Sequence, residues 1–306
     1  MPGAEEIKAR INSIRDTKKV TDAMYMISSV KMRRARRDVE STKPYFDALN
    51  DEIAVLFRYM PETENRYFHV PSPEKGKHMR HGILLITSDK GLAGSYNQSA
   101  IALAEDYRRR HPETVFFVVG EYGRQYFISK KIPFREDFIY PAEHPSVWEA
   151  KKICLELLEY YNDGRLDEIN VIYTDYRPGK PSECRISCLL PLERSRFSSE
   201  ARDDKGQKYE FYPNPDAVLE NVVPSYLSGY IYSLLVESYC SEQEARIDAM
   251  SSAGKNAENM LRELRIKYNR VRQAAITREI TEITAGARAI AKKKSPLSRK
   301  SQKQVE

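Results

Sequence analysis

Residues 5–58 read EEIKARINSIRDTKKVTDAMYMISSVKMRRARRDVESTKPYFDALNDEIAVLFR, with apolar side chains recurring at alternating spacings of four and three. This spacing is typical of a coiled-coil seam, the stripe along which one helix packs on another. The expected seam, with shifts of register near Lys18 and Lys31, is formed by Ile7, Ile11, Ile14, Val20, Met24, Ile27, Ala35, Val39, Thr42, Phe46, Leu49, Ile53 and Leu56. A helix of about fifty residues is about 75 Å long, so the stretch predicts a stalk rather than a helix of a compact domain.

The end of the chain carries a second seam, within a helical pattern from about residue 215 to residue 290. Its expected members are Ala257, Leu261, Leu264, Tyr268, Val271 and Ala275, followed one position out of step by Ile276, Ile280, Ile283, Ala287 and Ile290. Packing the two terminal seams against each other buries both at once, and we therefore predict an antiparallel pair of long helices. The basic, proline-containing residues 291–306 are expected to form a disordered tail.

The middle of the chain has a different period. Short continuous apolar runs at residues 82–87, 115–120, 169–173 and 184–190 alternate with helical patterns at 100–110, 122–130 and 146–161. Continuous apolar runs of this length are typical of strands covered on both faces, and strands alternating with helices favour a mainly parallel sheet. A Rossmann-like α/β domain is therefore expected here.

Together these patterns predict an α/β protein in which a long antiparallel coiled coil of the N- and C-terminal helices holds an inserted Rossmann-like domain. A length of 306 residues suits about two domains at roughly 150 residues each. The expected divisions are 1–58 for the N-terminal coiled-coil helix, 59–77 for a linker, 78–209 for the α/β domain, 210–290 for the C-terminal coiled-coil helix and 291–306 for the tail.

Composition and missing motifs narrow the functional classes. The chain is 41% hydrophobic and 31% charged, with a mean hydropathy of −0.62, and no apolar run reaches the roughly 18 residues of a membrane span. Its acidic start is unlike a signal peptide, and four scattered cysteines favour reduced thiols. It has no G-x-x-x-x-G-K-[ST] and no H-E-x-x-H sequence. We therefore expect no cofactor and no metal; the usual signatures of an enzyme are missing, which alone does not rule out an enzyme.

Two basic stretches, at residues 31–37 and 262–272, leave alternatives open. They are interpreted as solvated helix faces, as contacts for an acidic protein partner, or as part of a nucleic-acid-binding coiled coil. The net charge of +6 is low for a nucleic-acid-binding protein. A stand-alone enzyme built on the α/β domain is a further alternative. The glycine turn at residues 89–94 could cradle a phosphate, but it lacks G-x-G-x-x-G, and a tight strand-to-helix turn is favoured.

Four blocks of sequence carry a resemblance to a known family. Residues 7–34, 87–97, 241–250 and 268–287 read IKARINSIRDTKKVTDAMYMISSVKMRR, TSDKGLAGSYN, SEQEARIDAM and YNRVRQAAITREITEITAGA. In this order they resemble the gamma subunit of F-type ATP synthases from about residue 3 to residue 290. The sequence departs from the family at Ala93, a frequent cysteine, and at Tyr212, where the family often carries a carboxylate between an aromatic residue and a proline.

The resemblance implies a rotor shaft. In that family the paired helices stand inside a ring of alternating alpha and beta subunits, and the α/β domain lies below with the epsilon subunit on the membrane-embedded c-ring. The resemblance implies a non-catalytic subunit that couples ring rotation, driven by protons or sodium ions, to ATP synthesis or hydrolysis. It also implies no nucleic-acid partner and a peripheral location on the cytoplasmic face of the bacterial plasma membrane. The subunit contacts it implies are Met24, Arg34, Asp89, Lys90, Arg272, Gln273, Thr277 and Glu279.

Overall fold

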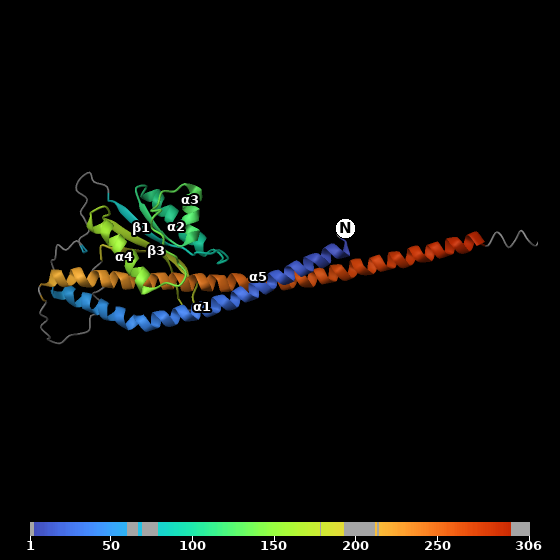
Figure 1. The fold of residues 1–306 in the computed structure, drawn as a ribbon, viewed down its shortest axis with the longest axis horizontal. Coiled ribbons are helices and arrows are strands. Elements are labelled where there is room, and N and C mark those ends of the chain that lie inside the picture. Colours follow the sequence, from blue (N-terminus) through green and yellow to red (C-terminus); the bar gives the residue numbers. More distant parts are fainter. Residues whose placement is uncertain are drawn as a thin grey trace, which may run out of the picture. The chain divides into compact units, whose positions relative to one another are not determined.

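The computed structural model describes residues 3–59, 67–68, 79–177, 179–192, 212 and 214–294. Figure 1 shows two long helices and an α/β domain. The elements in chain order are α1 (Ala4–Tyr59), β1 (His81–Ile86), α2 (Tyr96–Arg110), β2 (Val115–Val119), α3 (Glu121–Lys130), α4 (Val147–Asn162), β3 (Glu168–Asp175), β4 (Glu183–Leu190) and α5 (Pro215–Lys294). No described helix has a stretch apolar enough to cross a membrane.

The chain divides into two compact units. The stalk unit joins Met1–Ala23 to Met250–Glu306, and the body unit comprises Met24–Ala249. Most of the predicted linker lies outside the described residues, and so does the predicted tail beyond Lys294. Residues 291–294, which were expected to belong to a disordered tail, instead continue α5.

The sheet of the body unit has four strands in the order β2-β1-β3-β4. β1 pairs in parallel with both β2 and β3, whereas β4 runs antiparallel to β3. The predicted mainly parallel sheet is therefore confirmed. β4 follows β3 along the chain after a short connection, which suffices for an antiparallel neighbour but not for a parallel crossover.

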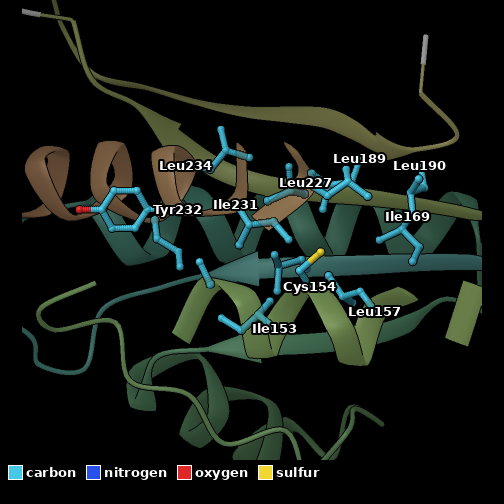
Figure 2. Close-up of a cluster of buried hydrophobic side chains, with 14 of the residues drawn as sticks. Ile153, Cys154, Leu157, Ile169, Leu189, Leu190, Leu227, Ile231, Tyr232 and Leu234 are labelled. Carbon is cyan, nitrogen blue, oxygen red and sulfur yellow. The ribbon is translucent and has the colours of Figure 1, made fainter. Parts of the chain in front are cut away.

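Both faces of the sheet are covered, which explains why its strands are continuously apolar. Leu84 and Ile86 of β1 join a buried cluster that includes residues of α4 and α5. Ile83 and Leu85, which alternate with them, join a second cluster with α2 and α3. Successive side chains of a strand point to opposite faces, and each buried leucine or isoleucine stabilises the fold by about 1.5–3 kcal/mol. Figure 2 shows side chains of α4, β3, β4 and α5 meeting in the first cluster.

The seam of α1 differs from the prediction in its middle. Val20 and Ile27, which were expected in the seam, are 60% and 49% exposed. Thr21 and Ser28 are buried in their place. One heptad register therefore continues through buried or half-buried residues at positions 7, 14, 21, 28, 35, 42 and 49. The two expected register shifts are wrong, because they followed the large apolar residues, whereas small polar residues occupy these seam positions. Thr21 satisfies its own hydroxyl by donating to the carbonyl of Lys18.

In the stalk unit α1 and α5 pack antiparallel, as predicted. Ile7 and Ile11 are buried with Leu261 near the start of α1, and Lys18 Nζ donates to Glu258 Oε1 at 2.5 Å further along it. As residue numbers increase along α1, the residue numbers of the partners on α5 decrease, so the two helices run in opposite directions. Residues Ile14, Leu264, Tyr268 and Val271 pack against this small core.

α5 continues beyond the point where α1 begins. Ala275 and the later part of its predicted seam, from Ile276 to Ile290, are exposed. Because α1 begins at Ala4, it is too short to cover this stretch. The expectation that the two seams bury each other over their full length is therefore wrong for the end of α5.

Candidate functional site: a turn bonded to both long helices

The first component of the site is the turn that follows β1 in the body unit. The Asp89 carboxylate accepts three backbone N–H groups, from Glu121 at 3.1 Å, Ala142 at 3.0 Å and Glu143 at 2.8 Å. Glu121 is the first residue of α3, where the helix dipole favours a nearby anion. β1 is a parallel strand, so its carboxyl end lies at the edge of the sheet where loops carry functional groups. Asp89 thereby holds the turn, the start of α3 and the loop before α4 together.

Glu143 connects this loop to α1. Its carboxylate accepts hydrogen bonds from the ammonium groups of Lys31 on α1 and of Lys90 in the turn. The Lys31 and Glu143 side chains are only 29% and 27% exposed. These ammonium groups, Lys31 first, lower the pKa of Glu143 to about 2. The carboxylate is therefore charged at any physiological pH, and the ion pair holds α1 against the α/β domain.

Arg246 connects the same turn to α5. Its Nη2 donates to the carbonyl oxygens of Lys90 at 3.2 Å and Gly91 at 3.1 Å. The same nitrogen lies 2.6 Å from Glu242 Oε1, and the two side chains are 5% and 7% exposed. Burial raises the pKa of Glu242, whereas Arg246 opposes that rise. A buried charge that loses its partner is strongly destabilising, so these two residues fix the turn firmly on α5.

A hollow of about 260 Å³ lies beside the turn, and the predicted contact residues Met24, Asp89 and Lys90 line it together. Gln243 also lines it, and its buried side-chain oxygen has no hydrogen-bond partner among the described residues. Arg34 lines a separate hollow of about 350 Å³ that also involves Lys31. Met24, Asp89, Lys90 and Arg34 are thus brought to two hollows that Lys31 lines in common.

The other four predicted contact residues lie on α5 in the stalk unit. Arg272, Gln273, Thr277 and Glu279 are all exposed. Thr277 Oγ1 donates to the backbone carbonyl of Gln273 at 2.9 Å, one helical turn earlier. The Gln273 and Thr277 side chains therefore share one helix face and are accessible to a partner, and their contact role stays a prediction.

The chemistry of the hollow in the body unit does not suit a phosphate. Three carboxylates, of Asp89, Glu143 and Glu242, line it, and its cations Lys31, Lys90 and Arg246 are already paired with two of them. Among the described residues, no group of three or more metal-ligating side chains comes together. The favoured interpretation of residues 89–94 as a tight turn agrees with this arrangement.

The sequence did not identify Glu143, Glu242 or Arg246 as functional residues. Glu242 and Arg246 stood in one of the quoted blocks, and their spacing of four on a helix was the available signal for an ion pair. Glu143 had no local signal, because its partner Lys31 lies 112 residues away along the chain.

Comparison with known proteins decides the family. The family model described as ATP synthase matches residues 3–290. The ATP synthase gamma chain of Ruminiclostridium cellulolyticum is 37% identical over 289 residues, which cover 93% of this chain and 98% of that protein. The chain belongs to the ATP synthase gamma-chain family. A further relative, the sodium-ion-specific ATP synthase gamma chain of Acetobacterium woodii, is 31% identical over 301 residues, covering 94% of this chain and 98% of that one.

Solved structures agree with the family at the level of the fold. A chain of the Euglena gracilis mitochondrial ATP synthase, from the OSCP/F1/c-ring assembly, matches with a TM-score of 0.65 at 16% identity, covering 95% of each chain. A central-stalk and c-ring structure of the Tetrahymena thermophila mitochondrial enzyme matches with a TM-score of 0.55 at 19% identity, covering 76% of this chain and 99% of that one. The predicted gamma-chain identity and the predicted fold class are both confirmed.

Proposed function

We propose that this gamma-chain family member is the central rotor shaft of an F-type ATP synthase. It couples rotation of an ion-driven membrane ring to conformational cycling of catalytic alpha and beta subunits. A ligand shifts a conformational equilibrium only through contacts that differ between the states. A shaft with unlike faces contacts each of three equivalent sites differently, so each orientation stabilises a different set of conformations.

The observation that carries the proposal is the exposed end of α5. Beyond the start of α1 this helix presents isoleucines, of which Ile283 is 67% exposed. Apolar groups that remain exposed along one element mark an interaction surface. The polar groups of Arg272, Gln273, Thr277 and Glu279 lie on the same helix. We propose that the alpha–beta ring surrounds this helix and that these four residues contact it.

The turn beside β1 supplies the second proposed set of contacts. Met24, Lys90 and Arg34 have accessible surface at or beside the hollow. Asp89 has both carboxylate oxygens engaged by backbone N–H groups. We therefore propose that Asp89 acts by holding Lys90 in position, while Met24, Arg34 and Lys90 meet the lower rim of the ring.

The remaining parts of the assembly are proposed from the family. The α/β domain contacts an epsilon subunit and the c-ring, and the chain has no nucleic-acid partner. It is peripheral, on the cytoplasmic face of a bacterial plasma membrane. We propose that it has no catalytic residue, because the charged groups around its hollow are paired with one another rather than directed at a substrate.

Reconstitution tests the proposed function. The chain is produced with the alpha, beta and epsilon subunits of its source, the complex is purified by a tag on beta, and ATP hydrolysis is measured with and without this chain. We expect stoichiometric recovery of the chain and turnover that depends on it. Recovery of active alpha–beta complexes without the chain, or hydrolysis by the chain alone, would contradict the proposal.

A further inference from the structure

We infer that Glu143 is the torque-bearing link between α1 and the α/β domain, and that Lys31 is its partner on the helix. The inference rests on the proposed rotor function and adds to it the path by which force passes between the domain and the two helices. Four observations in the body unit support it.

The first observation is a continuous polar chain from α1 into the sheet. Lys31 donates to the Glu143 carboxylate, and the backbone N–H of Glu143 donates to Asp89 Oδ2 at 2.8 Å. Asp89 Oδ1 accepts the N–H of Glu121 at the start of α3. A pull on Lys31 therefore reaches the turn after β1 and the start of α3 through hydrogen bonds and the short side chains of Glu143 and Asp89.

The second observation is that this chain of hydrogen bonds attaches the described middle part of α1 to the domain. Among residues 24–55 of α1, whose side chains the structure describes, Lys31 alone forms a side-chain hydrogen bond to residues 79–192. Other contacts of this part of α1 include a cation–π contact, with the Arg36 guanidinium 5.9 Å from the Tyr176 ring centre, and apolar packing of residues such as Ala35 and Ile53.

The third observation is that α5 is fixed to the same turn. Arg246 donates to the Lys90 and Gly91 carbonyls. α5 is also bonded to β3, because Ser238 Oγ accepts the N–H of Thr174 and Ser241 Oγ donates to its carbonyl, both at 3.2 Å. α5 is thus attached to the domain at several polar points, and residues 24–55 of α1, whose side chains are described, at one, so the load on this part of α1 reaches the domain through Glu143.

The fourth observation concerns direction. The hydrophobic effect is non-directional, whereas a hydrogen bond weakens steeply as it is bent or stretched. Shear between α1 and the domain therefore bends or stretches the Lys31–Glu143 bond, which resists it in addition to the packed side chains. Its side chains are mostly buried, so it is screened by salt less than an exposed pair would be.

The test is the coupling ratio of the complete complex in sealed vesicles, measured as ions transported per ATP hydrolysed. Glu143→Gln and Lys31→Met should each lower this ratio at least twofold, because the helix then slips against the domain under load. The double variant should lower it no further than the single ones, since both remove the same bond. Lys31→Arg, which keeps a donor and a charge, should retain most of the coupling.

Lys18→Met is the matched control. Lys18 also forms an ion pair from α1, but to Glu258 on α5 and not to the α/β domain. Its removal should leave the ratio unchanged. If Glu143→Gln prevents assembly, Lys31→Met removes the same bond from the helix side and decides the question. Purified complexes are compared at equal content of the chain, so that lost assembly is separated from lost coupling.

The outcomes separate the inference from the proposed function. A wild-type complex that hydrolyses ATP without transporting ions when this chain is present contradicts the rotor proposal itself. A coupled wild-type complex with equally coupled Glu143→Gln and Lys31→Met variants overturns the torque link and leaves the rotor proposal standing. Loss of coupling in Lys18→Met as well would show that any pair on α1 matters, which also overturns the assignment to Glu143.

Discussion

Replacing Arg246 with methionine should destabilise the body unit strongly while keeping a side chain of similar length. The change leaves the Glu242 carboxylate buried without its partner, which costs roughly 3–5 kcal/mol in buried ion pairs. It also removes the donor to two backbone carbonyls of the turn. At about 2–4 °C per kcal/mol for a unit of this size, the melting temperature should fall by roughly 6–20 °C.

The assay is thermal unfolding of the purified chain followed by circular dichroism over a range of pH. Burial raises the folded-state pKa of Glu242, and without Arg246 nothing opposes that rise. The folded variant then binds more protons than the unfolded chain, so its loss of stability should grow as pH rises above the unfolded pKa of about 4.5. The double variant Glu242→Gln/Arg246→Met carries no buried charge and should recover part of the lost stability.

Two results would refute this reasoning. A fall of only 1–2 °C for Arg246→Met would mean that the carboxylate finds water or another donor. A double variant that is less stable than Arg246→Met would mean that the glutamate itself contributes packing or hydrogen bonds that a neutral amide cannot replace.

Burial lowers the pKa of His81 below its usual 6.5, so the unfolded chain binds more protons, and the free energy of unfolding should fall as pH drops below about 6.5. Urea titrations of wild type and His81→Gln at several pH values check this, and an equal dependence of the unfolding free energy on pH in both proteins would contradict it. Gly229→Ala places a methyl group 2.0 Å from Phe46 Cδ1 and should cost roughly 1–3 kcal/mol by overpacking, measured by the same titration, with a neutral result showing that the ring can move. Gln273→Ala/Thr277→Ala should lower ATP turnover of the assembled complex about tenfold with unchanged helicity, since two hydrogen bonds are each worth roughly 0.5–1.5 kcal/mol; unchanged turnover with normal assembly would remove both residues from the proposed contact.

Much of the fold could be predicted from the sequence, because strands that are covered on both faces of the sheet are continuously apolar. The expected strand at residues 82–87 is β1 at His81–Ile86, and the run at 115–120 is β2 at Val115–Val119. The register of α1 was not predicted, because Thr21 and Ser28 occupy seam positions that hydrophobicity alone does not mark. Helix pairing depends on size as well as polarity, and small polar side chains serve where backbones approach.

The candidate site was predictable only in part. Resemblance to the family identified Met24, Asp89 and Lys90, which the structure places at one hollow. The bonds that hold this hollow together were not predictable, since Arg246 reaches a carbonyl 155 residues away in the sequence. A side chain that bonds to a backbone carbonyl requires no particular residue type at that carbonyl, so no pairwise sequence pattern records the contact.

The long separation between the paired helices has a consequence for synthesis. Lys18 and its partner Glu258 are 240 residues apart, so at about 5–20 residues per second the first helix emerges from the ribosome some 12–50 seconds before its partner. During that interval its seam has nothing to pack against, and exposed apolar stripes are prone to aggregate. Because Lys18, Thr21 and Ser28 are polar, this part of the stripe is less apolar and less prone to aggregate before α5 has been synthesised. The polar seam would then serve the nascent chain as well as the finished protein.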